Sequence, residues 1–279
     1  MTLRFTIGAF GQIEPIQIFS APTVYLDHWA VRRFADNAAL RARFIGALQG
    51  RNGTVMLSHL TFAEFAKAEL RATFETGEEF LEALLPNVYL AELDLDKAIA
   101  QEVRAGPRSH MLAPPADRQQ LLMIASLRQP FGSAFTIRGL LGEVSTHRDK
   151  VLLTLQETNA NIAARINNLR SDPLVVERAR SYKVAQTLSR TEVILAELLR
   201  GPNLTATTSI DENDAMDLQH ALISLSYCDF VLLDGKWEEW FKQMERRVAH
   251  LALPFRHARC FSDRRNGLQV FLDQLEAWP

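Results

Sequence analysis

The sequence is poor in the residues and segments that mark several protein classes. Two cysteines, Cys228 and Cys260, occur in 279 residues, which is too few for a disulfide framework, and they lack the paired spacing of a structural zinc site. No apolar run approaches the roughly 18 residues that a transmembrane helix needs, and the N-terminal residues lack the apolar core of a signal peptide. We therefore expect a soluble, cytoplasmic protein with no membrane partner.

The chain also lacks a strong excess of charge of either sign. Lys and Arg number 31 and Asp and Glu number 33, for a formal net charge of −2, so any contact with nucleic acid depends on local basic patches. No P-loop, GxGxxG or HExxH motif is present, which excludes the usual nucleotide-binding and zinc-protease mechanisms. What the chain does have is apolar material, 47% of its residues, enough for a sizeable core.

Short β-branched and apolar runs alternate with helical patterns in two stretches of the chain. The first stretch predicts three strand–helix pairs. The strands are 23–27, 54–58 and 88–93, and the helices that follow them are 30–49, 61–72 and 97–104. The second predicts a helix, a strand and a helix at 213–227, 229–233 and 236–247, and a closing strand and helix between 255 and 278. Alternating strands and helices favour a parallel sheet. We expect one α/β core from residues 22–106 and 206–279, after an N-terminal extension, 1–21.

Residues 107–205 differ from this core because they read as helical almost throughout. Two segments stand out, Glu143 to Arg170 and Pro173 to Arg200. Asp172 before Pro173 is typical of a helix start, and Gly201-Pro202 is typical of a stop. These signals predict an inserted helical hairpin. Residues 107–205 carry 13 basic and 8 acidic residues, whereas residues 61–102 carry 3 and 10.

Four acidic residues fall where the expected strands end. Asp27 ends the first strand, Glu64 lies in the first turn after the second strand, and Asp234 follows the strand 229–233. Asp217 lies early on the helix that leads into that strand, with His220 about 60° further round it. In open α/β sheets ligands bind outside the carboxyl ends of the strands, so we expect these side chains to share one cleft.

Carboxylates that share a cleft repel one another and raise one another's pKa unless divalent cations neutralise them. Oxygen ligands with few histidines suit Mg²⁺ or Mn²⁺ better than zinc. Two such ions about 4 Å apart can orient a water molecule and stabilise the oxygens of a phosphodiester undergoing attack. The acidic residues therefore predict metal-assisted phosphodiester hydrolysis.

Four motifs carry a resemblance to a known family. They are Val24-Tyr-Leu-Asp27, Leu57-Ser-His-Leu-Thr-Phe-Ala-Glu64, Asp214-Ala-Met-Asp217-Leu-Gln-His-Ala221 and Cys228-Asp-Phe-Val-Leu-Leu-Asp234-Gly-Lys236. In type and order they resemble the acidic motifs of the PIN-domain nucleases. The resemblance covers roughly residues 22–105 and 209–265 and leaves the helical insertion outside.

The resemblance implies a PIN-like three-layer α/β/α core and a metal-dependent endoribonuclease, as in the toxins of many bacterial toxin-antitoxin pairs. Carried over, Asp27, Glu64, Asp217 and Asp234 become the catalytic, metal-binding acids, and Asp214 an accessory metal ligand. An antitoxin-like inhibitory protein partner and a toxin or anti-phage role are further implications. Two positions depart from the family pattern, because Trp29 and Leu232 stand where small polar residues are common.

Simpler roles exist for several of these residues. Thr61-x-x-Glu64 and Asp211-x-x-Asp214 both have the form of helix-capping boxes.

Candidate substrate contacts lie near the acids at His28, His220, Lys236, Arg32 and Arg33. Residues 246–265 hold six arginines against one acid, a pattern that suits phosphate binding or a solvated surface.

Two other functions stay open at this point. One is a catalytically weak PIN-like scaffold that binds RNA or protein, and the other is a structure-specific DNA nuclease. The inserted hairpin suits three roles: gripping a structured RNA, forming a homodimer, or binding an inhibitory partner.

Overall fold

A computed structural model of the chain describes most of its length, namely residues 3–9, 11, 13–67, 71–85, 87–106, 112–128, 137–181, 189–205, 209–249 and 257–279. Its strands form two sheets. The strands are β1 (Leu3–Ile7), β2 (Ile13–Gln17), β3 (Thr23–Leu26), β4 (Thr54–Ser58), β5 (Val88–Ala91), β6 (Phe230–Leu232) and β7 (Arg259–Phe261). Strands β1 and β2 form an antiparallel hairpin, and the other five form one sheet in the order β5-β4-β3-β6-β7.

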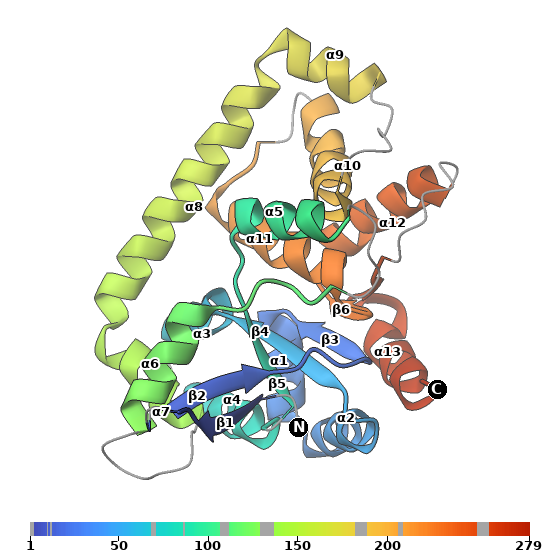
Figure 1. Ribbon diagram of the computed structural model, residues 1–279. Coiled ribbons are helices and arrows are strands. Elements are labelled where there is room, and N and C mark those ends of the chain that lie inside the picture. The colour runs from blue at the N-terminus through green and yellow to red at the C-terminus, as the bar shows by residue number, and fades with distance from the viewer. Residues whose placement is uncertain are drawn as a thin grey trace.

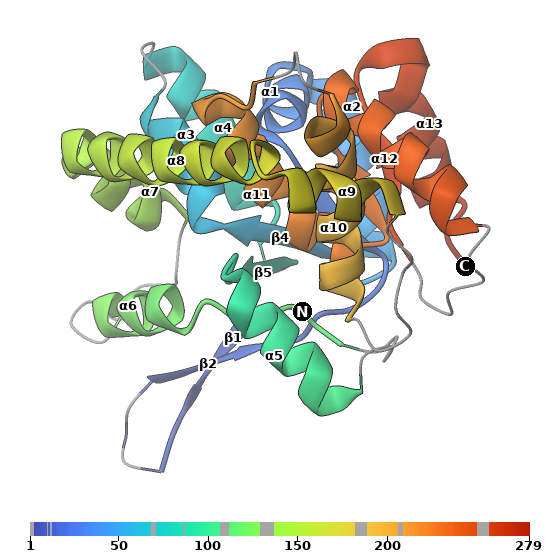
Figure 2. The same cartoon turned by 90° about the horizontal axis from the view of Figure 1, so that it is seen from above.

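Every pairing in the five-stranded sheet is parallel, which confirms the α/β class expected from the alternating pattern. The helices lie on both faces of the sheet (Figures 1 and 2). They are α1 (His28–Asp36), α2 (Ala38–Gly50), α3 (His59–Ala66), α4 (Arg71–Ala83), α5 (Leu95–Ala105), α6 (Arg118–Arg128), α7 (Ile137–Thr146), α8 (Arg148–Arg170), α9 (Pro173–Ser181), α10 (Arg190–Leu204), α11 (Glu212–Tyr227), α12 (Gly235–Ala249) and α13 (Gly267–Glu276), with a 3₁₀ turn, η1, at Arg264–Asn266.

The side chains of β3 show how the two faces are divided. Val24 and Leu26 point into an apolar cluster formed with α1, α2, α4, α7 and α13. Tyr25 points to the opposite face, where residues of α5, α10, α11 and α12 pack. Successive side chains on a strand alternate between faces, and both faces here are buried. The sheet is therefore the middle of three layers.

The strand order places a topological switch point between β3 and β6. From β3 the chain moves outward through β4 to β5, and it later returns to the other side of β3 to form β6 and then β7. At such a point the flanking loops lead to opposite faces and leave a crevice at the carboxyl ends of the strands, where ligands of open α/β sheets bind. The Asp27 amide donates to the Leu232 carbonyl across this boundary at 3.0 Å.

The N-terminal segment covers one edge of the sheet. Gln17 accepts a hydrogen bond from the Leu90 amide at 2.7 Å and donates to the Leu90 carbonyl at 3.2 Å. The Asp117 amide also donates to the Leu90 carbonyl, and Pro115 accepts from the Glu92 amide at 2.8 Å. Polar backbone groups along β5 are thus paired although β5 is an outer strand.

Two of the expected helices have different bounds. The segment 30–49 is two helices, because Asn37 is extended and its side chain accepts from the Leu40 amide as the N-cap of α2. The helix expected at 61–72 begins earlier, at His59, and ends at Ala66, while residues 68–70 lie outside the described part of the chain.

The helical segment between the two parts of the sheet is more broken than the expected hairpin. Residues 143–170 are divided by a break at His147 between α7 and α8. The expected single helix 173–200 is wrong, because Ser189 is extended and caps a new helix, α10, which then passes the predicted stop and includes Pro202. Packing of α10 on α5, α11 and α12 outweighs the hydrogen bond that proline removes.

In Figure 1, α8 leads away from the sheet to α9, and α10 returns. Helix α8 packs along α11 and α3, and α9 packs mainly on α10. None of the helices in the described part of the chain combines the length and apolarity needed to cross a membrane. Even α8, with 23 residues, begins with Arg148, Asp149 and Lys150.

Candidate metal centre

Asp27 lies where β3 ends and α1 begins. Its backbone is extended, and its Oδ1 accepts a hydrogen bond from the His28 amide at 2.7 Å, so the side chain caps α1. The residue is 9% exposed. A capping aspartate is ordinary at a helix start, but burial of its charge beside other acids is not. Asp27 therefore caps α1 and also holds a buried carboxylate close to other acidic side chains.

Glu64 does not cap its helix. The capping box of α3 is formed by Ser58 and Thr61, so the alternative in which Glu64 and Thr61 form that box is wrong. Glu64 lies one helical turn further on and is buried. Its Oε2 lies 3.3 Å from Nε2 of His220 on α11. The side chain therefore faces another element of the fold across the carboxyl edge of the sheet.

His220 is fixed by the strand beneath it. Its Nδ1 forms a short hydrogen bond with the hydroxyl of Tyr25, which lies in the middle of β3. The ring is 1% exposed. Its Nε2 faces Glu64 at ion-pair distance but makes no well-directed hydrogen bond among the described residues. A buried nitrogen in this condition is costly unless another group supplies the missing interaction.

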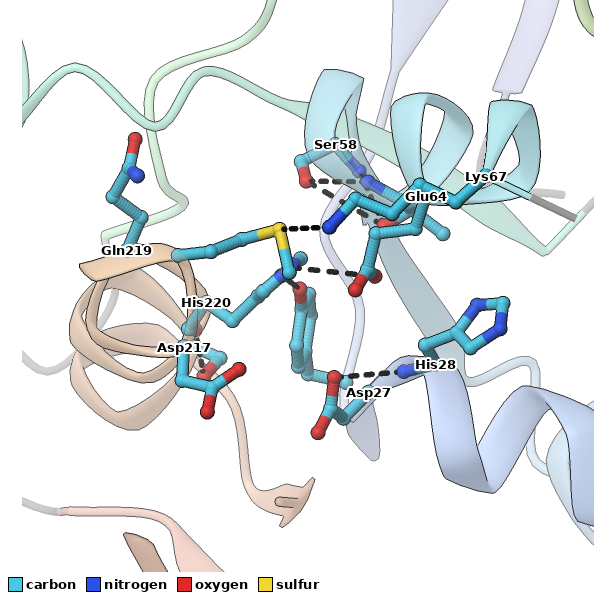
Figure 3. A network of polar contacts seen from close by, with 12 residues as sticks. Asp27, His28, Ser58, Glu64, Lys67, Asp217, Gln219 and His220 are labelled. Carbon is cyan, nitrogen blue, oxygen red and sulfur yellow. Dashed lines mark hydrogen bonds and ion pairs between the residues drawn. The ribbon is translucent and has the colours of Figure 1, made fainter. Parts of the chain in front are cut away.

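Asp27, Glu64 and His220 converge on one point. Each offers a ligand atom, and these atoms all lie within 4.8 Å of one another. Figure 3 shows Asp27, Glu64 and His220 reaching this point from the N-cap of α1, from α3 and from α11, with the Asp217 carboxylate beside them. Two carboxylates and an unpartnered imidazole nitrogen fit a divalent cation, which supplies positive charge and accepts a nitrogen lone pair.

Asp217 lies at the rim of this group. It is half-buried, and its Oδ2 accepts a hydrogen bond from Nε1 of Trp237 at 3.1 Å. Burial raises the pKa of Asp217 to about 6, and repulsion by the neighbouring Asp234 adds to the rise. Ala221 and Ser224, the small residues that follow Asp217 at helical spacing, are fully buried in the packing of α11.

Asp234 follows β6 and begins α12. Its Oδ1 accepts hydrogen bonds from the amides of Lys236 and Trp237, both at 2.9 Å. The residue lies at the same edge of the sheet as Asp27, since β3 and β6 are paired neighbours. Asp234 is not one of the three converging residues, but its charge acts on Asp217.

Asp214 has two structural partners. It forms the capping box of α11 with Asp211, as its spacing predicts, and its Oδ1 forms an ion pair with Lys236. Lys236 also lies over the ring of Trp240, 5.0 Å from its centroid. Lys236 therefore neutralises the residue that the family resemblance suggests as an accessory ligand.

The charges in this group shift one another's proton affinity. Burial raises the pKa of Asp27 to about 7. Attraction to His220 lowers this pKa, and repulsion from Glu64 and Asp217 offsets part of that lowering. Burial alone would lower the pKa of His220, but the combined attraction of Glu64, Asp27 and Asp217 raises it. Burial alone would raise the pKa of Glu64, and attraction to His220, with His28 and Lys67, lowers it instead.

The candidate substrate contacts on α1 are placed differently from one another. The His28 ring packs edge-on against Phe65, with centroids 5.6 Å apart, and burial lowers its pKa. Figure 3 shows this ring pointing away from Asp217 and His220. Arg32 pairs with Asp36 at 3.4 Å, and Arg33 is exposed. None of the three adds to the converging group.

One residue near the site was missed by the sequence analysis, and a second was identified only as one of the six arginines of residues 246–265. The first is Tyr25, whose alternation with Val24 and Leu26 places its hydroxyl on the α11 face, where a buried hydroxyl needs a partner. The second is Arg264, whose Nη1 donates to the Gly235 carbonyl at 3.2 Å, next to Asp234. A Cβ at Gly235 would lie 2.1 Å from Arg264 Nε, so only glycine allows this approach.

The two residues that depart from the family pattern, Leu232 and Trp29, pack in the core. Leu232 is fully buried in β6, and Trp29 packs against the apolar cluster under α1.

A separate cavity of about 350 Å³ opens between α3, α6, α7 and α8, and its wall is mostly apolar. It contains none of the predicted catalytic residues.

Comparisons with known proteins leave the relationship of the chain open. No family model, no curated protein and no solved structure matches it.

Proposed function

We propose that this protein is a PIN-like nuclease that hydrolyses RNA phosphodiester bonds with the help of Mg²⁺ or Mn²⁺. One observation carries the proposal: Asp27, Glu64 and His220 offer ligand atoms within 4.8 Å of one another at the carboxyl edge of a parallel sheet. Buried acids with a raised pKa and a specific charged partner in a crevice are the usual mark of a functional site.

The topology supports the same proposal. The three converging residues come from segments that follow β3 and β4 and from the helix that leads into β6, and β3 and β6 flank the switch point. Sites of open α/β proteins form at this position. The order of the acids along the chain, Asp27, Glu64, Asp217 and Asp234, is the order in the family that the motifs resemble.

The residues divide into two roles. Asp27, Glu64 and His220, which are buried, hold the cation, whereas Asp217 and Asp234, which are half-buried, lie on the side from which a substrate approaches. A bound Mg²⁺ or Mn²⁺ supplies Lewis acidity that activates water and stabilises charge on phosphate oxygens. Arg264, whose guanidinium lies beside Gly235, supplies positive charge for the phosphate backbone, whereas the Lys236 ammonium is paired with Asp214.

Cleavage assays with mixed RNA test the proposal. We expect cleavage in Mn²⁺ or Mg²⁺, loss of cleavage in EDTA and its return when the ion is added back. Asp27→Asn keeps the helix cap but removes a charged ligand, so we expect cleavage to fall by about 100-fold or more. Asp96→Asn, an exposed acid in the first turn of α5, is the matched control and should retain full activity.

Other results would assign other functions. RNA binding without cleavage under all ion conditions would favour the scaffold function, and the helix caps made by Asp27 and Asp234 would then be purely structural. Faster cleavage of flap or duplex DNA than of RNA would favour a structure-specific DNA nuclease. Cleavage that survives both EDTA and Asp27→Asn would overturn the proposal.

A further inference from the structure

We infer that His220 is itself a ligand of the cation, through Nε2, and that this nitrogen makes the site favour transition ions over Mg²⁺. The inference rests on the proposed function in that it concerns the same site. Carboxylates alone were expected to form the site. A histidine ligand changes the ion that the site selects, which the acidic motifs do not indicate.

The first support is the state of Nε2. The ring is 1% exposed, and Nε2 has no hydrogen-bond partner among the described residues although Glu64 Oε2 lies 3.3 Å away. An ionised carboxylate only accepts hydrogen bonds, so Glu64 does not satisfy a lone pair on this nitrogen. The same nitrogen faces the point on which Asp27 and Glu64 converge. A cation at this point would satisfy it.

The second support is the partner of the other ring nitrogen. Nδ1 is engaged by the hydroxyl of Tyr25, which is fully buried in β3. Metal-binding histidines almost always donate their second ring N–H to a neighbouring acceptor, which fixes the tautomer and aims the free lone pair at the metal. The inference places the ring proton on Nδ1, donated to the Tyr25 oxygen, so that His220 presents the Nε2 lone pair to the space between the carboxylates.

The consequence is a preference among ions. Mg²⁺ demands oxygen ligands in a near-ideal octahedron and parts with its waters reluctantly, whereas first-row transition ions accept imidazole, with affinity rising from Mn²⁺ to Cu²⁺. A site of two carboxylates and one imidazole therefore binds Mn²⁺ more tightly than Mg²⁺. The preference depends on His220, because the other two donors are carboxylates.

Calorimetric titrations of the full chain with Mn²⁺ and with Mg²⁺ measure this preference. For the wild type we expect Mn²⁺ to bind at least about 10-fold more tightly than Mg²⁺. His220→Gln replaces the nitrogen by an amide oxygen, and should bring the two affinities close together by weakening Mn²⁺ binding. Tyr25→Phe should weaken Mn²⁺ binding about 10-fold because the ring loses its orienting partner. His147→Gln, an exposed histidine, is the control and should behave as the wild type.

Pulsed electron paramagnetic resonance of the Mn²⁺-loaded wild type tests the bond itself and needs no variant to fold. We expect the nitrogen coupling of a directly bound imidazole, retained in Tyr25→Phe and absent in His220→Gln. Mn²⁺ binding without that coupling, with Mg²⁺ bound equally well, would overturn the inference and leave the proposed nuclease intact. If neither ion binds the wild type, the proposed function fails, and the inference fails with it.

Discussion

The two faces of the central sheet are built from different kinds of side chain. On the face of α1, α2 and α13, phenylalanine rings pack against one another, including Phe34 on Phe44 with centroids 4.7 Å apart. On the face of α5, α10 and α11, buried polar groups recur, among them Tyr25, Glu102 and His220. The first face contributes mainly apolar burial, whereas the second holds charges whose positions are set by specific partners.

This difference indicates that the two faces respond differently to substitution and to pH. An aromatic cluster tolerates little loss of volume but is insensitive to pH, and a buried charged group depends on its partners and on protonation. The candidate metal centre lies on the polar side, where His220 of α11 meets Tyr25 of β3. Substitutions on the two faces should therefore differ in size, sign and pH dependence.

The largest effect is expected on the aromatic face. Phe34→Ala removes a fully buried ring whose centroid also lies 5.7 Å from that of the Phe80 ring. The substitution should lower the free energy of unfolding by about 3–5 kcal/mol. Urea denaturation measures the change. The control is Val270→Ala, 42% exposed on α13, which should change stability by no more than about 0.5 kcal/mol. A loss below about 1 kcal/mol for Phe34→Ala would remove the distinction between the faces.

A smaller loss is expected from a buried charge on the polar face. Glu102, 1% exposed on α5, accepts hydrogen bonds from the amide and the hydroxyl of Thr191 on α10, at 3.0 and 2.7 Å. Glu102→Gln keeps the volume but removes the charge that these donors and the nearby Arg190 face. We expect a loss of about 1–3 kcal/mol in the same denaturation experiment. An unchanged midpoint would show that the carboxylate does not hold α5 to α10.

The third effect has the opposite sign. Asp27→Asn should stabilise the metal-free protein, because it removes a buried charge repelled by Glu64 and Asp217. The folded-state pKa of Asp27, about 7, lies above its unfolded value, so its ionisation destabilises the fold as pH rises from about 4 to 7. The advantage of the variant over wild type should therefore grow by about 1 kcal/mol for each pH unit between pH 5 and 7 and level off above that range.

Thermal denaturation in EDTA at several pH values measures that advantage. Asp96→Asn serves again as the control and should show no comparable pH-dependent difference from wild type. A stabilisation that is the same at pH 5 and at pH 8 would mean that Asp27 is ionised throughout, and that burial and its neighbours do not shift its pKa.

The sequence predicted the architecture well where local signals and tertiary packing agree. The strands at Thr23, Thr54, Val88 and Phe230 were visible as β-branched and apolar runs, and their alternation with helices indicated the parallel sheet. Helix ends were predicted less well. Asn37 and the Ser189 capping box interrupt segments whose apolar pattern continues, and Pro202 was given more weight than the packing of α10 allows.

The candidate site was only partly visible for a geometric reason. Spacing along a helix placed His220 near Asp217, but it carries no information about the hydroxyl of Tyr25 on a strand almost 200 residues earlier. The acids of the motifs lie at one edge, as expected from strand ends. Which of them converge depends on side-chain partners such as Trp237 for Asp217 and Lys236 for Asp214.

The contact between Gln17 and Leu90 has a consequence for how the chain can be shortened. The glutamine amide occupies the place of a sixth strand, donating and accepting as a backbone peptide would. Deleting residues 1–21 would remove the partner of the Leu90 amide, whereas the Leu90 carbonyl would keep the Asp117 amide, and unpaired strand edges recruit other strands. We therefore expect a chain trimmed for crystallisation or assay to self-associate more readily, and light scattering measures this.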